Sequence, residues 1–186
     1  MPQLNSIGLV ESSSIAIGFE IEDAMLKAAQ VELILARTIC SGKFLVVVGG
    51  DVADTLAAVQ AGRAAARGAL IEARHIPRVH PDVFPAISCA VELTPDQARA
   101  IGVVETFSAS SIIECADAAA KAANVKLFRI HLAMAIGGKG FFSLTGDVAA
   151  VEAAVAAGAA VASESGILVA TAIIPGPRRE LFSEYI

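Results

Sequence analysis

Cysteine is the residue type in this chain with the clearest capacity for redox or metal chemistry. The sequence has three cysteines, Cys40, Cys89 and Cys115, which are odd in number and far apart. This arrangement fits reduced thiols better than a disulfide framework. Cys40 lies at a predicted tight turn between two apolar runs, from which its side chain can project. One cysteine cannot hold a metal, but a cyclic oligomer can bring three such thiolates to its axis, enough to ligate three irons of a [4Fe–4S] cluster.

Two Gly-Lys pairs invite comparison with a nucleotide-binding P-loop. That motif needs a glycine five residues before its Gly-Lys and a Ser or Thr after it. Arg37 stands at that distance before Gly42-Lys43, and Ala133 before Gly138-Lys139. Neither lysine is followed by Ser or Thr. The pattern therefore predicts hairpin glycines and not nucleotide hydrolysis.

The carboxylates with recognisable positions favour structural roles. Asp51 and Asp147 each follow a glycine and open a predicted helix, where a carboxylate accepts backbone N–H bonds. Glu11 and Glu105 end equivalent strands of an internal repeat, which favours a shared structural task over a single catalytic centre. We assign none of these four residues to catalysis.

The three histidines, His75, His80 and His131, are interpreted as packing or surface residues. They form no Cys/His pattern with the spacing of a structural zinc site, and no Ser-His-Asp order predicts a nucleophile. The sequence thus indicates a protein that is not an enzyme.

Composition excludes several classes of partner. The net charge is −5 with both signs interspersed, so no basic surface for nucleic acid is expected. The longest stretch free of Asp, Glu, Lys and Arg, residues 165–177, is too short to cross a bilayer as a helix. No basic segment followed by an apolar one opens the chain, so we expect a cytoplasmic protein that does not contact membranes.

An internal repeat organises the chain. At an offset of 94 residues, Ile7-Gly8-Leu9-Val10-Glu11 aligns with Ile101-Gly102-Val103-Val104-Glu105. At the Gly-Lys pairs the offset is 96, and the same offset aligns Gly50-Asp51-Val52 with Gly146-Asp147-Val148. Ile76-Pro77 and Ile174-Pro175 close the two copies. The second copy therefore carries two extra residues in the loop before its Gly-Lys. We predict a first domain at residues 1–80, a connection at 81–97 and a second domain at 98–186.

Each copy is predicted to have the order strand, helix, strand, strand, helix, strand. The first copy places them at Ser6–Glu11, Ile15–Ala29, Val31–Ile39, Lys43–Val48, Asp51–Gly68 and Ala69–Ile76. The strands of the second copy are expected at Ala100–Glu105, Val125–Ala133, Phe141–Leu144 and Ile167–Ile174. This order is the ferredoxin-like βαββαβ arrangement, so the fold class is α+β with two tandem domains.

With these features placed, both copies resemble the bacterial microcompartment (BMC) shell domain over nearly the whole chain. The resemblance rests on the Ile7–Glu11 strand, the Asp23-Ala24 and Lys27-Ala28-Ala29 helix, Gly42-Lys43 and Gly50-Asp51-Val52. It implies a structural shell protein of flat tiles, in which three double-domain chains form a pseudohexameric homotrimer. It also implies that hairpin loops surround a central pore. The implied pore-lining residues are Cys40, Ser41, Gly42, Gly137 and Gly138.

The segment from Thr38 to Leu45 is similar to the propanediol-utilisation subfamily of tandem shell proteins. That resemblance implies that Cys40 supplies one of three ligands to a [4Fe–4S] cluster on the trimer axis, for electron transfer across the shell. Ser41 replaces the proline of the subfamily's Thr-Ile-Cys-Pro-Gly-Lys context. The alternatives are an open pore that conducts small metabolites without a cluster, and a ligand-binding regulatory module.

The resemblance extends to the edges of the tile. Lys27 and Lys121 match lysines that meet across neighbouring tiles, and Arg78 lies in a similar edge segment. The implied partners are therefore further copies of the chain, neighbouring shell hexamers and trimers, and a redox enzyme in the lumen.

Overall fold

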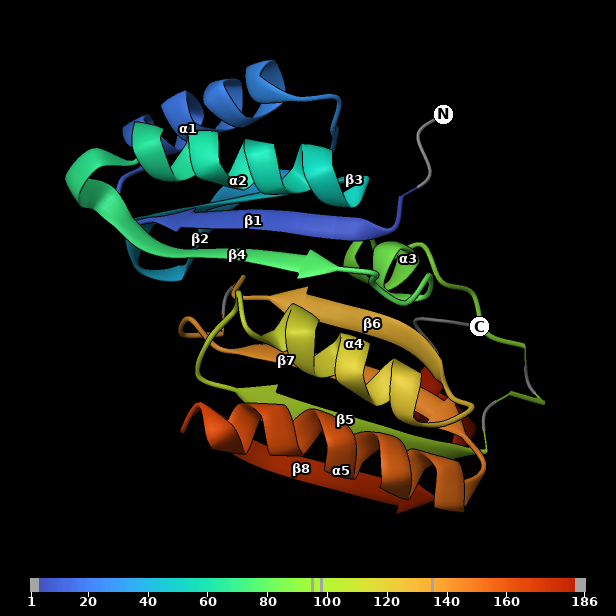
Figure 1. Cartoon of the computed structure of the whole chain (residues 1–186). Coiled ribbons are helices and arrows are strands. Elements are labelled where there is room, and N and C mark those ends of the chain that lie inside the picture. Colours follow the sequence, from blue (N-terminus) through green and yellow to red (C-terminus); the bar gives the residue numbers. More distant parts are fainter. Residues whose placement is uncertain (1–3, 95, 98, 135, 183–186) are drawn as a thin grey trace. The chain divides into compact units, whose positions relative to one another are not determined.

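The structure is a computed structural model that describes residues 4–94, 96, 97, 99–134 and 136–182 (Figure 1). It divides into two compact units, residues 1–81 with 134–137 and residues 82–133 with 138–186. The predicted domain limits at residues 1, 98 and 186 lie outside the described residues.

The first unit is a four-stranded antiparallel sheet with two helices on one face (Figure 1). Its elements are β1 (Ser6–Ser12), α1 (Ile15–Ala28), β2 (Glu32–Ile39), β3 (Lys43–Gly50), α2 (Val52–Ala65) and β4 (Leu70–Pro77). The strand order β2-β3-β1-β4 is that of a ferredoxin-like sheet. The predicted fold class and the order of elements are confirmed, and no boundary shifts by more than three residues.

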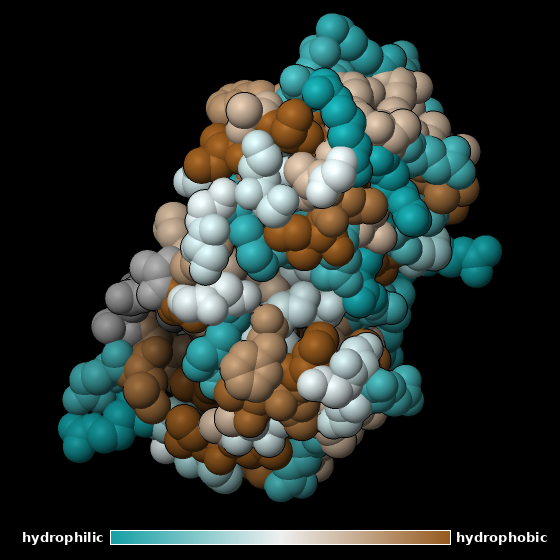
Figure 2. All heavy atoms as spheres, turned by 90° about the vertical axis from the view of Figure 1, so that its left-hand side faces the viewer, coloured by the Kyte–Doolittle hydropathy of each residue, from teal (hydrophilic) through white to brown (hydrophobic). Residues whose placement is uncertain are grey.

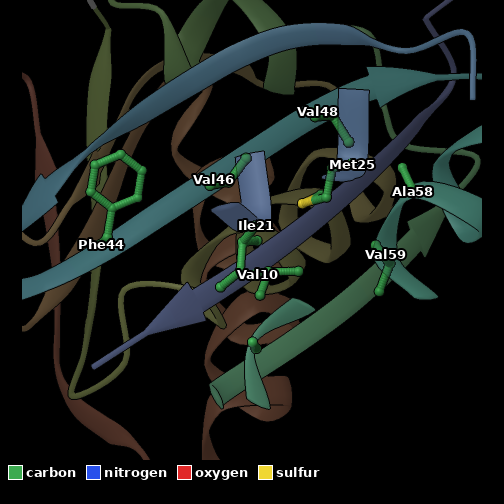
Figure 3. Packing of buried hydrophobic residues seen from close by; sticks show 9 residues of the cluster. Val10, Ile21, Met25, Phe44, Val46, Val48, Ala58 and Val59 are labelled. Carbon is green, nitrogen blue, oxygen red and sulfur yellow. The ribbon is translucent and has the colours of Figure 1, made fainter. Parts of the chain in front are cut away.

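The core of this unit fills the space between the sheet and its helices (Figure 3). Alternate residues of a strand point to the same face, and Val10, Val46 and Val48 face the helices in this way. Ile21 and Met25 of α1 pack against them from the other side. All five side chains are buried. Because burial of such side chains provides the main driving force for folding, this layer holds the hairpin between β2 and β3 in place.

The second unit repeats the same plan. Its elements are β5 (Ala100–Thr106), α4 (Ile112–Ala122), β6 (Lys126–Leu132), β7 (Gly140–Gly146), α5 (Val148–Glu164) and β8 (Leu168–Pro175). Its strand order is β6-β7-β5-β8. The strand β7 is longer at both ends than predicted. No helix among the described residues of either unit has the length and hydropathy to span a bilayer.

The connection, for which no helix or strand was predicted, contains a short helix, α3 (Val83–Ile87). Pro85 occupies the third helical position. Proline is tolerated there because the first four N–H groups of a helix have no hydrogen-bond partner within the helix. The helix packs against β6, and Asp82 beside it accepts a bond from Lys126 of that strand at 2.9 Å. The connection is therefore built into the second unit.

The two predicted helix caps behave differently. Asp51 Oδ1 accepts a bond from the backbone N–H of Asp54 at 2.9 Å, so this cap is confirmed. Asp147 occupies the equivalent position but makes no capping bond. Its Oδ1 instead accepts a bond from Arg99 Nη1 at 2.7 Å. The prediction for Asp147 was wrong because an arginine 48 residues upstream competes for the carboxylate.

Asp51→Ala is expected to lower the free energy of unfolding by about 1 kcal/mol, since it removes a capping bond. Asp147→Ala is the matched control and should cost less than half as much, because exposed ion pairs contribute little. Urea denaturation of both variants measures the difference. Equal losses for the two variants would contradict the assigned roles.

Candidate functional site

The turn between β2 and β3 carries Cys40. It is a single 3-10 turn, Cys40–Gly42, closed by the paired residues Ile39 and Lys43. Cys40 is half-buried and forms no disulfide. Gly42 has φ 72°, as expected of the predicted hairpin glycine, and Ser41 has φ 66°. The thiol therefore lies on a three-residue turn in which the next two residues have positive φ.

The conformation of Ser41 bears on the difference from the proline subfamily. A φ of 66° lies in the left-handed region, whereas the ring of proline fixes φ near −65°. A proline at position 41 cannot adopt this turn. With serine at position 41, the turn therefore adopts a backbone conformation that is inaccessible to proline.

Substitutions at Ser41 test this strain. Ser41→Gly is expected to raise the free energy of unfolding by about 1 kcal/mol, because glycine tolerates positive φ without a Cβ clash. Ser41→Pro should lower it by about 2 kcal/mol, because its ring forces the turn open. Urea denaturation measures both changes, and a proline variant as stable as the wild type would exclude the observed turn.

An ion pair holds the base of the Cys40 turn. Lys43 Nζ lies 2.8 Å from Glu11 Oε1, and the Glu11 side chain is 4% exposed. In the second copy Lys139 Nζ lies 2.7 Å from Glu105 Oε1. The lysines of the Gly-Lys pairs therefore bind strand-end glutamates, which agrees with the structural task predicted for these carboxylates.

The equivalent loop of the second copy is longer and has no cysteine. It runs from Ala133, whose N–H bonds to Lys139 O at 3.1 Å, and the exposed Met134 follows Ala133. Gly137 and Gly138 both have positive φ, 68° and 86°. The two hairpins thus differ in length and in side-chain chemistry.

A single chain offers no metal centre within its described residues, where no three His, Cys, Asp or Glu side chains lie together. Cys115 is buried on α4 and Cys89 is exposed after α3. Neither joins Cys40 in the sequence-based site. A cluster at Cys40 therefore requires thiolates from several chains.

The histidines have partners that sequence analysis did not identify. His75 Nε2 lies 3.1 Å from both Ser6 Oγ and Thr55 Oγ1. The second copy has Ala100, Val151 and Ile173 at the equivalent positions. Three polar residues of the first copy are thus replaced by apolar ones in the second. A comparison of the two copies could have predicted from this difference that His75, Ser6 and Thr55 lie together.

In the second unit, His131 stacks on Phe141 with ring centroids 5.2 Å apart. Arg129 lies over the same ring at 5.4 Å. His75 and His131 thus pack against other residues of their own units, which agrees with the interpretation of the histidines as packing or surface residues.

The sequence-predicted edge residues Lys27, Lys121 and Arg78 are all exposed. Lys27 pairs with Asp23, and Lys121 with Asp117, each at 2.6 Å within one helix. Arg78 is exposed, with φ 54°. Each lysine already forms an ion pair with a carboxylate one helical turn away. A contact with a neighbouring tile would therefore have to share or replace that ion pair.

Two exposed residues outside the Cys40 turn, Arg99 and Glu180, have clearly shifted pKa values. The hydrogen bond and charge of Asp147 raise the pKa of Arg99 above its usual value. The hydrogen bond from Arg178 lowers the pKa of Glu180. Both effects stabilise the charged forms that these residues already have at neutral pH.

Equivalent positions of the two copies differ in exposure. Phe19 of α1 is 60% exposed, whereas its counterpart Ile113 in α4 is fully buried. Leu33 of β2 is exposed and its counterpart Leu127 is buried. Apolar residues accordingly appear among polar ones on the surface in Figure 2. The first copy therefore leaves open an apolar surface on α1 and β2.

The second copy leaves open the strand at the other edge of its sheet. All residues from Ala170 to Pro175 of β8 are exposed. Ile174 is 37% exposed, while its counterpart Ile76 in β4 is 6% exposed. Each copy thus exposes apolar side chains at positions that the other copy buries.

A comparison with protein families matches the BMC domain twice, at residues 6–79 and 100–177. The two matches cover most of the chain, and each falls largely within one unit. The chain belongs to the BMC domain family. The family predicted from sequence and the tandem BMC fold are confirmed.

Several relatives share this organisation. The bacterial microcompartment shell protein PduT of Citrobacter freundii is 41% identical over 97% of both chains. The shell protein EutM of Salmonella typhimurium is 43% identical over 44% of this chain and 91% of its own length. A crystal structure of a microcompartments protein from Desulfitobacterium hafniense DCB superposes with a TM-score of 0.92 at 49% identity, over 97% of this chain and 99% of that one. A single BMC domain thus forms nearly all of one relative, and the tandem arrangement recurs in two others.

Proposed function

We propose that this BMC-domain chain is a structural shell protein that forms a homotrimeric tile, with the three Cys40 turns around a central pore. Membership of the BMC family and the similarity to shell proteins support the structural role and argue against an enzyme. The single observation that carries the trimer is the complementary exposure of the two copies. The tile would lie in the shell of a cytoplasmic microcompartment.

Head-to-tail association explains that exposure. The open surface of the first copy lies on α1 and β2, and that of the second copy lies on β8. Because these surfaces differ, one chain can cover the β8 surface of the next in a heterologous contact, which must close into a ring to satisfy every copy. Three double-domain chains would give a ring of six similar domains.

We further propose that Cys40 supplies one thiolate per chain to a [4Fe–4S] cluster on the axis. The residues fit this group in donor chemistry, because a thiolate is the usual ligand of such clusters. Cys40 is half-buried on a short turn, whereas Cys115 is fully buried. When bound, the cluster would supply one-electron transfer, and a redox enzyme in the lumen would be its partner.

Anaerobic reconstitution with iron and sulfide tests this proposal on the intact chain. Wild type is expected to give a trimer of 19.0 kDa chains by light scattering, with visible absorbance and electron paramagnetic resonance signals of a cluster. Cys40→Ser should lose the signals and keep the trimer. Cys89→Ser is the matched control and should keep both. Signals unchanged in Cys40→Ser would sink the assignment.

The second candidate is an open pore that conducts small metabolites. The loop of the second copy favours it, because Gly137 and Gly138 carry no side chains and both have positive φ. A wild-type trimer that binds no iron under the same conditions would support this alternative. Layers of tiles in electron microscopy would count against a soluble regulatory module and would indicate contacts with neighbouring shell hexamers and trimers, where Lys27, Lys121 and Arg78 are the proposed edge residues.

A further inference from the structure

The Cys40 turn is joined to the sheet by an ion pair in which one partner is almost fully buried. Glu11 lies near the end of β1, a central strand whose seven residues are all buried. Its side chain is 4% exposed, and that of Lys43 is 32% exposed. A buried carboxylate is costly unless a cation compensates it. The ammonium group of Lys43 is therefore strongly held at this position.

Lys43 transmits that constraint to the turn because it is the first residue of β3. It pairs with Ile39 across the hairpin, so only Cys40, Ser41 and Gly42 lie between the two paired residues. Phe44, the next residue, is buried and packs against the ring of Phe19 with centroids 5.1 Å apart. Both ends of the Cys40 turn are thus fixed to ordered strands.

The second copy contains the same pair in a different setting. The side chains of Lys139 and Glu105 are 37% and 32% exposed, so solvent screens their attraction. The loop before Lys139 begins at Ala133 and is longer than the Cys40 turn. The pair formed by Lys139 and Glu105 is therefore an internal control for the pair formed by Lys43 and Glu11, with the same residue types and a weaker ion pair.

We infer that Glu11 and Lys43 form a positioning pair for Cys40, which fixes where each chain presents its thiol. This inference rests on the proposed function in so far as the thiol binds a cluster. The pair itself does not ligate iron. It limits the motion of the turn, so that thiols from three chains can converge on one cluster without each turn being ordered on binding. The pair formed by Lys139 and Glu105 has no such effect on Cys40.

The first test needs no cluster. A nitroxide label attached to a small fraction of the Cys40 thiols, in a Cys89→Ser background, reports the mobility of the turn through its resonance line shape, because trimers then carry at most one label and spin–spin broadening is avoided. Lys43→Met should mobilise the label, whereas Lys139→Met should leave the line shape unchanged, and Lys43→Arg should restore the ordered spectrum. If Lys43→Met fails to fold, the variant Glu11→Gln/Lys43→Met removes the buried charge as well and should still mobilise the label. Equal spectra for the Lys43 and Lys139 variants would overturn the inference.

The second test measures retention of the cluster in unlabelled trimers. Loss of visible absorbance to an iron chelator is expected to be about tenfold faster in Lys43→Met than in wild type, a magnitude typical of residues that orient metal ligands. Lys139→Met should match wild type, and a Lys43→Met rate equal to it would contradict the inference. A wild-type protein that binds no iron would instead refute the proposed cluster, and the label would still decide the positioning role.

Discussion

Ile174→Asp is expected to convert the trimer into a folded monomer. The side chain is 37% exposed on β8 in the single chain, so a carboxylate there remains hydrated and should lower the free energy of unfolding by only about 1 kcal/mol, through the poorer strand propensity of Asp. In a ring, the neighbouring chain would cover it, and a buried charge without a partner costs several kcal/mol. The larger effect therefore falls on assembly.

Light scattering and circular dichroism together measure this outcome. The matched control is Ala160→Asp, which places the same charge at an exposed position of α5 and should leave the trimer intact. A trimeric Ile174→Asp variant would show that β8 is not part of the contact between chains. An unfolded variant would show that the charge disturbs the domain itself.

Gly18→Ala should lower the free energy of unfolding by about 3 kcal/mol. Gly18 is buried in α1, and a Cβ built there would overlap the Cβ and ring carbons of Phe44. Alanine favours a helix over glycine by about 1 kcal/mol, but that gain is smaller than the cost of displacing a buried ring. Since Phe44 follows Lys43, the substitution should also loosen the Cys40 turn.

Gly68→Ala is the matched control, because no atom lies within 4 Å of a Cβ at that position. It should be neutral or stabilising by a few tenths of a kcal/mol. Urea denaturation of the two variants measures the contrast. A Gly18→Ala variant more stable than wild type would mean that helix propensity outweighs the contact with Phe44.

The regular elements could be predicted because their signals are local. Apolar runs ending at Pro77 and Pro175 define β4 and β8, and repetition at fixed offsets reveals both copies. The short helix α3 was missed because its proline resembles a turn signal. The predicted capping bond of Asp147 is absent because Arg99, from a distant part of the sequence, binds the carboxylate instead.

The site could be predicted only in outline. The turn and its cysteine follow from neighbouring residues, but the pairing of Glu11 with Lys43 joins residues 32 positions apart. Helical periodicity does not reveal that Phe19 is exposed while its counterpart Ile113 is buried. Such differences arise from packing between elements, which a single sequence does not specify.

The open strand β8 has a consequence for newly made chains. It is the last strand of its sheet and carries apolar side chains, and such an edge is a template for uncontrolled strand pairing. Ring closure therefore competes with aggregation, and the balance depends on chain concentration. Pro175 at its end lacks an N–H and shortens the usable edge. High expression of the chain should consequently favour fibrous or tubular by-products whenever closure is slow.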